Sequence, residues 1–266
     1  MLEVIDKGPR TESDRTPLLF VHGAWHGAWC WDEHFLDFFA GRGYRSVAVS
    51  LRGHGRSAAP KPLRLCSMAD LVEDVASVAD GLPRRPVVIG HSMGGFVVQK
   101  YLESHDAPAA VLLAAVPPSG ITLFLGRRFR MHPWRFGLDL ARGRSQRSIC
   151  GTPDLAREAF FSGGTPEADV ARFATYFGEE YVGRHVFDML VFDLPKPHLV
   201  TAPVLVLGAE HDTCFSAREV HKTAAAYQAE AEIVPDMGHD MMLERGWSGV
   251  AERIHAWLQA REPARS

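Results

Sequence analysis

One short segment of the chain holds a serine in a setting that can make it a nucleophile. The residues Gly90-His91-Ser92-Met93-Gly94 follow an apolar, strand-like run at 86–90 and precede a helical pattern that starts at Phe96. In so sharp a strand-to-helix turn the serine backbone is strained, and a side chain at either glycine would collide with its neighbours. The helix N-terminus adds partial positive charge beside the hydroxyl. The flanking patterns argue against a chance match, so Ser92 is the candidate nucleophile.

Ser92 needs a general base, and the base needs a carboxylate that orients it. A glycine-containing loop at 234–240 follows the last predicted strand, and its His239 can turn toward the serine. His211 is the rival base, but it adjoins the candidate acid in sequence and would have to point away from it. His91 is adjacent to Ser92 and is set aside for the same reason. We therefore predict His239 as the base.

The orienting acid is expected at the end of another strand. An apolar run ends in Ala209-Glu210-His211-Asp212, which brings two carboxylates to the edge where Ser92 lies. We prefer Asp212 to Glu210 because a residue on the loop beyond the strand can reach across to a histidine. The order serine, aspartate, histidine is the one expected for a nucleophile on a strand-to-helix turn. Asp240, next to the base, is interpreted as a loop or cap residue.

Backbone N–H groups are expected to stabilise the negative oxygen of a tetrahedral intermediate, because losing one such donor typically costs a factor of about 10²–10³ in rate. We assign one donor to Met93, the residue after the nucleophile. The other is assigned to Ala24, with Trp25 as the alternative, because Gly23 lets the loop after the apolar run at 18–21 approach closely.

Two histidines of the same loop, His22 and His26, raise the question of a metal site. Residues four apart bind one metal together on a helix, whereas the glycines around these two favour a loop. We interpret His22 as a hydrogen-bonding brace for its loop. We therefore predict no metal site, and no cofactor is implied.

The elements that must position these residues alternate along the chain. Continuous apolar runs rich in Val, Leu and Ile predict strands buried on both faces, at 18–21, 47–49, 87–89, 111–113, 204–207 and 232–234. Amphipathic patterns between them predict helices, and two of these begin with capping signatures, Ser67 with Asp70 and Ser216 with Glu219. Strands alternating with helices indicate an α/β fold with a mostly parallel central sheet and helices on both faces.

One stretch interrupts this alternation. No convincing strand-like run occurs between about 120 and 196, and nine of the fifteen phenylalanines lie there. Pro117-Pro118 precedes the stretch, and Pro195 and Pro197 close it. We expect residues 119–196 to form an inserted, mainly helical lid on a core made of residues 1–118 and 197–266, without folding separately.

The aromatic lid suggests an apolar substrate pocket, although packing of the lid on the core explains the phenylalanines equally well. The candidate substrate-binding residues are Trp25, His91, Phe124 and Met241. Seven arginines crowd into one part of the lid, opposed mainly by Asp139: Arg127, Arg128, Arg130, Arg135, Arg142, Arg144 and Arg147. A solvated helix face is the simpler interpretation of this cluster, and docking on an anionic membrane surface or an anionic substrate group is the alternative.

The composition bounds the class of protein. The chain is 46% hydrophobic and 23% charged, as in ordinary globular proteins, and its net charge of −3 does not favour a nucleic-acid partner. No apolar run is long enough to span a bilayer, and the N-terminus becomes polar after five residues. The four cysteines are scattered without a C-x-x-C pair, so we expect a cytoplasmic protein with free thiols. No particular oligomeric state is indicated.

Together these segments resemble the α/β-hydrolase superfamily. The resemblance rests on HGAW at 22–25, LRGHGRS at 51–57, GHSMGG at 90–95, GAEHD at 208–212 and MGHD at 237–240, and it omits the lid. The segment at 22–31 is also similar to the opening loop of plant methyl esterases and hydroxynitrile lyases, whereas GAEHD and MGHD are more similar to bacterial esterases and lipases. Ser50 departs from the aspartate that often precedes L-R-G. A serine nucleophile separates the chain from the similar haloalkane dehalogenases and epoxide hydrolases, which use aspartate.

The resemblance implies a serine hydrolase that cleaves a carboxylic ester, thioester or lactone of a small, apolar substrate through an acyl-enzyme. Two alternatives stay open. One is a hydroxynitrile-lyase-like or C–C-cleaving enzyme on the same triad, and such lyases tend to need a lid cation, for which Lys196 is the only nearby lysine. The second is a non-catalytic small-molecule receptor of the same fold.

Overall fold

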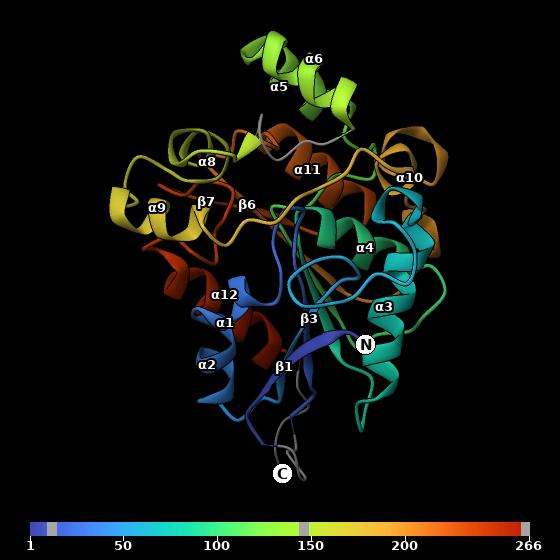
Figure 1. Cartoon of the computed structure of the whole chain (residues 1–266). Helices are drawn as coiled ribbons and strands as arrows, with labels where there is room; N and C mark the ends of the chain where they lie inside the picture. The colour runs from blue at the N-terminus through green and yellow to red at the C-terminus, as the bar shows by residue number, and fades with distance from the viewer. Residues whose placement is uncertain (10–14, 144–148, 262–266) are drawn as a thin grey trace.

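A seven-stranded sheet forms the centre of the computed structural model, which describes residues 1–9, 15–143 and 149–261 (Figure 1). The strands are β1 (Glu3–Lys7), β2 (Leu18–Val21), β3 (Ser46–Ser50), β4 (Val87–His91), β5 (Ala110–Leu113), β6 (Val204–Ala209) and β7 (Ala231–Val234). Their order across the sheet is β1-β3-β2-β4-β5-β6-β7, and every neighbouring pair is parallel except β1 with β3. The predicted α/β fold with a mostly parallel sheet is confirmed.

The six strands predicted from apolar runs correspond to β2 through β7. The edge strand β1 has no counterpart in the sequence prediction, because its residues EVIDK are largely polar and only partly buried. It runs antiparallel to β3 and places Glu3 opposite Ser50. The Ser50 hydroxyl donates to Glu3 Oε2 at 2.7 Å and accepts the N–H of Ala28 at 2.8 Å. Ser50, which stands where the family often has aspartate, therefore holds the loop after β2 through its hydroxyl group.

Helices cover both faces of the sheet, as predicted. In Figure 1, α1 (Trp29–Asp32), α2 (Phe35–Ala40) and α12 (Trp247–Gln259) lie on one side, and α3 (Met68–Asp80) and α4 (Met93–Tyr101) lie on the other. The helix α11 (Ala217–Ala226) packs against β6 and β7. The capping boxes predicted at Ser67 and Ser216 are present at the starts of α3 and α11. None of the helices within the described ranges is long and apolar enough to cross a lipid bilayer.

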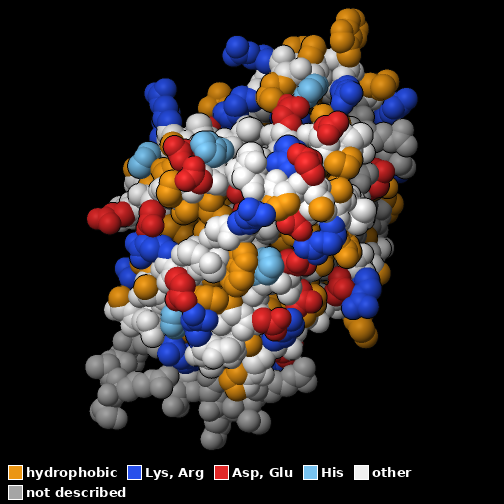
Figure 2. Space-filling view, turned by 90° about the vertical axis from the view of Figure 1, so that its left-hand side faces the viewer, with side chains coloured by type: hydrophobic (Ala, Val, Ile, Leu, Met, Phe, Trp, Pro, Cys, Tyr) orange, Lys and Arg blue, Asp and Glu red, His pale blue; other side chains and the backbone are white. Residues whose placement is uncertain are grey.

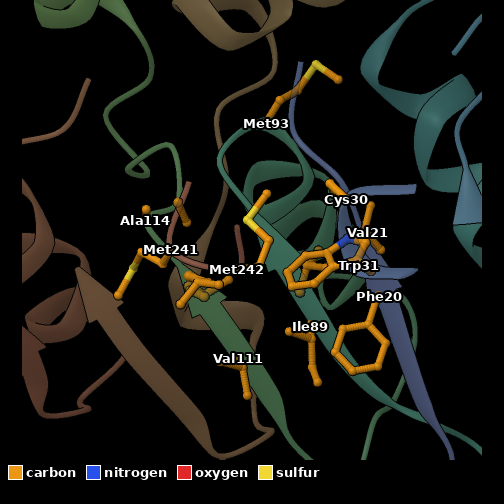
Figure 3. Packing of buried hydrophobic residues seen from close by; sticks show 14 of the residues in the cluster. Phe20, Val21, Cys30, Trp31, Ile89, Met93, Val111, Ala114, Met241 and Met242 are labelled. Atoms are coloured by element: carbon orange, nitrogen blue, oxygen red, sulfur yellow. The ribbon is translucent and has the colours of Figure 1, made fainter. Parts of the chain in front are cut away.

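The core lies along the central strands, whose residues are buried on both faces. Figure 3 shows side chains from β2, β4 and β5 packed with those of Trp31 and Met242. Burial on both sides explains why these strands are continuously apolar and do not alternate with polar residues.

The segment between β5 and β6 is helical, and its described residues contain no strand. It comprises α5 (Thr122–Met131), α6 (Pro133–Arg142), α8 (Pro153–Phe160), α9 (Glu167–Ala174), α10 (Arg184–Phe187) and a π-helical turn at Asp188–Phe192. A short 3-10 turn at Pro197–Leu199 precedes β6, and another at Leu63–Leu65 precedes α3. Phe160, Phe173 and Phe177 belong to the same buried cluster as the strands. The lid thus shares the core of the molecule, while its limits at 119 and 196 stay a prediction.

Candidate active site

Ser92 lies in the turn between β4 and α4, and its backbone is strained. Its φ of 52° and ψ of −119° fall in a region that side-chain-bearing residues seldom adopt. A Cβ on Gly94 would lie 2.3 Å from the carbonyl oxygen of Val21, and one on Gly90 would lie 2.5 Å from that of Gly94. Both glycines are therefore required by close backbone approach. The turn leaves Ser92 at the edge of a cavity that it helps to line.

His239 and Asp212 meet although 27 residues separate them in the chain. His239 Nδ1 donates to Asp212 Oδ2 at 2.9 Å. The other carboxylate oxygen accepts the backbone N–H groups of Cys214 at 2.7 Å and Phe215 at 3.0 Å. Both side chains are almost completely buried. The carboxylate is thus fixed by three hydrogen bonds, and it sets the tautomer of the imidazole, leaving Nε2 as the nitrogen that can accept a proton.

Two opposing effects act on the pKa of His239. Burial alone would lower this pKa, because a buried imidazolium loses its hydration. The charge of Asp212 and its hydrogen bond act in the opposite direction, and the net result is a pKa above the ordinary value of 6.5. The histidine is therefore a somewhat stronger base than a free imidazole.

The two rival residues of the sequence analysis lie away from this pair. Glu210 is exposed and accepts the backbone N–H of Asp236 at 3.0 Å. His211 is also exposed, 3.9 Å from the Asp236 carboxylate. Neither residue lines the cavity that Ser92 and His239 share.

That cavity has a volume of about 150 Å³, and its wall is mostly apolar. The predicted oxyanion residues Ala24 and Met93 line it, as do the predicted substrate-binding residues Trp25 and Phe124. The rest of the wall comes from the strand ends and the lid: Val116, Ile121, Leu125, Phe136, Ile149, Glu180, Val182, His185, Val186, Phe187, Met189, Leu190, Cys214 and Phe215. The lid therefore supplies most of the surface that a substrate would touch.

Two predicted substrate-binding residues, His91 and Met241, do not line this cavity, and both are fully buried. His91 is the last residue of β4, and its ring lies 4.7 Å from that of His239, measured between ring centroids. Its Nε2 donates to the backbone oxygen of His239 at 3.0 Å. Burial, followed by the proximity of His239, holds the pKa of His91 well below its usual value, so the ring is a neutral brace. Met241 packs into the core instead (Figure 3).

The loop after β2 approaches Ser92 closely, because a Cβ on Gly23 would lie only 2.9 Å from Ser92 Cβ. His22 braces this loop as the sequence suggested. Its Nδ1 donates to the backbone oxygen of Gly23 at 2.7 Å, and its Nε2 accepts the N–H of Leu51 at 3.0 Å. Met93 is the first residue of α4, so its N–H lacks an acceptor within the helix.

A second histidine–aspartate pair lies behind the site, and the sequence analysis missed it. Asp240 lies in a loop as expected, but it is fully buried, with Oδ2 3.0 Å from His26 Nε2. The Nδ1 atom of His26 lies 2.7 Å from the backbone oxygen of Ala24. A neutral imidazole has a single N–H, yet both nitrogens of His26 face acceptors. The pair joins the loop of Ala24 to the loop that carries His239.

The cavity wall also contains a carboxylate that the sequence analysis missed, Glu180. His54 Nε2 lies 2.9 Å from Glu180 Oε2, and His185 Nε2 lies 3.0 Å from Oε1. Burial alone would raise the pKa of Glu180, but the two histidines hold it well below its usual value. Against burial, Glu180 raises the pKa of His54. The only sequence signal is an acidic pair, Glu179-Glu180, in an aromatic segment.

Metal binding fits these side chains poorly. Two buried groups bring three potential ligand atoms within 4.8 Å of one another. The first group is Asp212, Cys214 and His239, and the second is His91, His239 and Asp240. The Asp212–His239 hydrogen bond already uses the central atoms of the first group. Burial raises the pKa of the Cys214 thiol well above its usual value, whereas a metal binds the thiolate. His22 and His26 form no such group in the described part of the chain.

Comparisons with known proteins agree with this architecture. A family model described as "Alpha/beta hydrolase family" matches residues 18–253. A non-heme haloperoxidase from Rhodococcus erythropolis is 32% identical over 247 residues, which cover 85% of this chain and 86% of that protein. A non-heme chloroperoxidase from Streptomyces lividans is 42% identical over 117 residues, but the match spans only 42% of this chain and 40% of that protein.

A solved structure extends the likeness to the three-dimensional fold. A thermophilic esterase from Thermogutta terrifontis superposes with a TM-score of 0.74 at 20% identity, covering 98% of this chain and 94% of that chain. The family model covers the sheet from β2 onward, and the Rhodococcus relative is similar over most of its length. The chain therefore belongs to the alpha/beta hydrolase family.

Proposed function

We propose that this protein is a serine hydrolase that cleaves a carboxylic ester, or a related thioester or lactone, of a small and mostly apolar substrate. The observation that carries the proposal is the buried His239–Asp212 hydrogen bond of 2.9 Å beside a cavity lined by both His239 and Ser92. A base oriented by a carboxylate and next to a strained serine is the arrangement that makes a hydroxyl nucleophilic.

In the proposed mechanism, His239 Nε2 takes the Ser92 proton while the serine oxygen attacks the ester carbonyl. The N–H groups of Ala24 and Met93 stabilise the resulting oxyanion. The bond to the alcohol then breaks, and His239 returns the proton to the departing oxygen. Water repeats the attack on the acyl-enzyme and releases the acid, while Asp212 stays ionised and stabilises the imidazolium.

The size of the cavity favours short substrates. Its volume of about 150 Å³ matches that of a cavity known to hold benzene. The apolar wall stabilises an alkyl or aryl group by removing it from water. We therefore expect acetyl and butyryl esters to be cleaved faster than lauroyl esters.

The test compares p-nitrophenyl ester hydrolysis by the wild type with that by Ser92→Ala and His239→Ala. Each variant should lower kcat by at least about 10⁴-fold, as for other enzymes of this mechanism. His211→Ala is the matched control, because this exposed histidine lies outside the cavity, and it should keep full turnover. A fluorophosphonate should label Ser92 alone. Full turnover by Ser92→Ala would refute the proposal.

A second candidate function comes from the haloperoxidase and chloroperoxidase names of the relatives. If hydrogen peroxide replaces water as the attacker, the acyl-enzyme releases a peracid, which oxidises halide to hypohalous acid and returns the carboxylic acid. Bromination of monochlorodimedone in hydrogen peroxide, bromide and acetate tests this activity. Loss of bromination in Ser92→Ala supports peracid formation at the same serine, and its persistence contradicts it.

A lyase and a non-catalytic receptor of the same fold predict different outcomes. A lyase on the same triad is expected to present a lid cation to the substrate, but Lys196 does not line the cavity. Release of an aldehyde from a cyanohydrin, without ester turnover, would favour the lyase. A non-catalytic receptor would bind small esters without a burst of p-nitrophenol.

A further inference from the structure

The lid helices α5 and α6 form a hairpin that extends beyond the rest of the molecule (Figure 1). Its inner side is fixed to the core. The ring of Phe124 is buried 6.0 Å from that of Phe215. Arg127 Nη1 lies 2.9 Å from Glu219 Oε2, so this arginine forms an ion pair with α11. These two contacts hold α5 to the core.

The inner side also removes two arginines from the basic cluster predicted from the sequence. Arg127 forms an ion pair, and Arg128 is only 2% exposed, with Nη1 3.5 Å from Glu158. Arg144 and Arg147 lie outside the described residues, as does the side chain of Asp139. The interpretation of all seven arginines as one solvated face is therefore wrong.

The outer side of the hairpin is unusually apolar for a surface. Trp134 is 90% exposed, and four further large apolar side chains on the same hairpin are between 45% and 59% exposed: Leu123, Phe129, Met131 and Leu138. Figure 2 shows hydrophobic and basic side chains together at the top of the molecule, at the height of this hairpin. An exposed apolar cluster is typical of a surface that binds another molecule.

Three arginines contribute to the exposed surface of the same hairpin. Arg130, Arg135 and Arg142 are exposed, and no acidic partner pairs with them in the described part of the chain. We call the exposed surface of the hairpin, made of these arginines and the five exposed apolar residues, the hairpin face. Aromatic and aliphatic side chains mixed with arginines are typical of helices that lie in the interface of an anionic bilayer. The apolar groups enter the acyl boundary while the guanidinium groups contact phosphates.

We propose that the hairpin face docks this enzyme on an anionic lipid surface. The face projects outward, as suits insertion into an interface. Its three arginines, which have no acidic partner among the described residues, complement a negatively charged headgroup layer, although the whole chain has a net charge of −3. Leu125 of α5 and Phe136 of α6 line the cavity that holds Ser92, so docking brings that cavity next to the lipid. Uptake of an ester from the lipid rests on the proposed function, whereas docking itself does not.

The experiment measures sedimentation of the protein with vesicles of phosphatidylcholine alone and of phosphatidylcholine with phosphatidylglycerol. Wild type should bind the anionic vesicles and lose binding as salt rises, because salt screens the arginines. Trp134→Ser should weaken binding at every salt concentration, since it removes the most exposed apolar side chain. Loss of one arginine is expected to weaken binding about fivefold at low salt. Arg135→Glu should weaken it by more than that, because it also adds a negative charge.

Arg85→Glu is the matched control, because Arg85 is exposed and lies just before β4. It is therefore at the amino-terminal ends of the parallel strands, whereas Ser92 is at their carboxyl ends. This variant should bind like wild type. Because Trp134 and Arg135 do not line the cavity, hydrolysis of a soluble ester should be unchanged in their variants and reports that they are folded. Ser92→Ala should bind vesicles fully even if it is inactive, which separates docking from the proposed function.

Three results would overturn the docking proposal. The first is wild-type binding that is absent or equal on neutral and anionic vesicles. The second is equal binding by Arg135→Glu and Arg85→Glu. The third is a concentration-dependent dimer in analytical ultracentrifugation that Trp134→Ser dissociates, because this would assign the hairpin face to a second copy of the chain.

Discussion

In the proposed mechanism the residue that decides the chemistry is His239, and its surroundings act on its pKa in opposite directions. Burial favours the neutral ring, and the Asp212 carboxylate favours the charged ring and prevails. The carboxylate also fixes the tautomer through its 2.9 Å hydrogen bond to Nδ1. Asp212 thus contributes both orientation and basicity, and the two contributions can be separated by their pH dependence.

The pH profile of ester hydrolysis should show this balance. The base must be neutral to accept the serine proton, so kcat/KM should rise with pH through a pKa above the ordinary 6.5. Asp212→Asn leaves burial without the compensating charge, so the same limb should move to lower pH while kcat falls by about 10⁴-fold. Glu210→Gln should change neither. An acid limb that stays in place in Asp212→Asn would show that Asp212 does not set the pKa of His239.

At the scale of elements, the site is made by loops that follow parallel strands. The loops after β2, β4, β6 and β7 carry the Ala24 N–H, Ser92, Asp212 and His239. Parallel strands bring their carboxyl ends to one edge of the sheet, where these loops must meet. Two loops are tied directly, because His26 contacts both Ala24 O at 2.7 Å and Asp240 Oδ2 at 3.0 Å. We infer that this tie positions the proposed oxyanion donor relative to the base.

Cutting the tie should therefore affect catalysis more than binding. In His26→Gln the side-chain oxygen, which can only accept, replaces one ring nitrogen and faces an acceptor, so the two loops should shift relative to each other. A misplacement of about 1 Å can cost a factor of about 10² in rate, so we expect kcat to fall by up to that amount with little change in KM. His198→Gln, at an exposed histidine, is the control.

Activity in that experiment is normalised to active sites titrated with a fluorophosphonate. A purely structural role for His26 would lower the number of labelled sites and leave kcat per site unchanged. That outcome would contradict positioning of the oxyanion loop by the His26–Asp240 pair.

At the scale of the whole molecule, the lid is joined to the core by a buried charge pair. Glu180 of the lid lies 2.9 Å from His54 Nε2 of the core. The Nδ1 atom of His54 faces the backbone oxygen of Arg52 at 3.2 Å, so both nitrogens of this ring also face acceptors. The raised pKa of His54 and the lowered pKa of Glu180 agree with an imidazolium paired with a carboxylate. Removing one partner of a buried pair costs about 3–5 kcal/mol, because it strands the other charge.

This pair makes stability depend on pH in a defined window. The pKa of Glu180 is lowered in the folded state, so its contribution is present above the unfolded value of 4.5 and is lost as pH falls through the folded value. The pKa of His54 is raised, so its contribution is present below the unfolded value of 6.5 and is lost as pH rises through the folded value. Both groups therefore contribute their full stabilisation of the folded state between pH 4.5 and pH 6.5.

Thermal unfolding should therefore show the largest difference between wild type and Glu180→Gln in this window. The variant should melt roughly 6–20 °C lower there, from a loss of about 3–5 kcal/mol, and the difference should shrink at higher pH. Glu230→Gln, at an exposed glutamate, should melt like wild type at every pH. A difference in melting temperature that is independent of pH would rule out the ion pair as its cause.

Local patterns in the sequence were sufficient to predict the strands β2 to β7, the capped helices α3 and α11, and the turn at Ser92. They also predicted the contact between Asp212 and His239, because parallel strands bring their ends to one edge wherever they occur in the chain. The edge strand β1 was missed because a half-exposed strand leaves no continuous apolar run.

Only the tertiary structure decided which side chains face the cavity and which buried charges pair. His26 and Asp240 are 214 residues apart, and His54 and Glu180 are 126 apart. No periodicity or motif connects such positions, because their contact depends on how the lid and the loops pack on the sheet. For the same reason Arg128 and Met241 are buried while Trp134 is exposed, although hydropathy alone would place the arginine and the tryptophan the other way round.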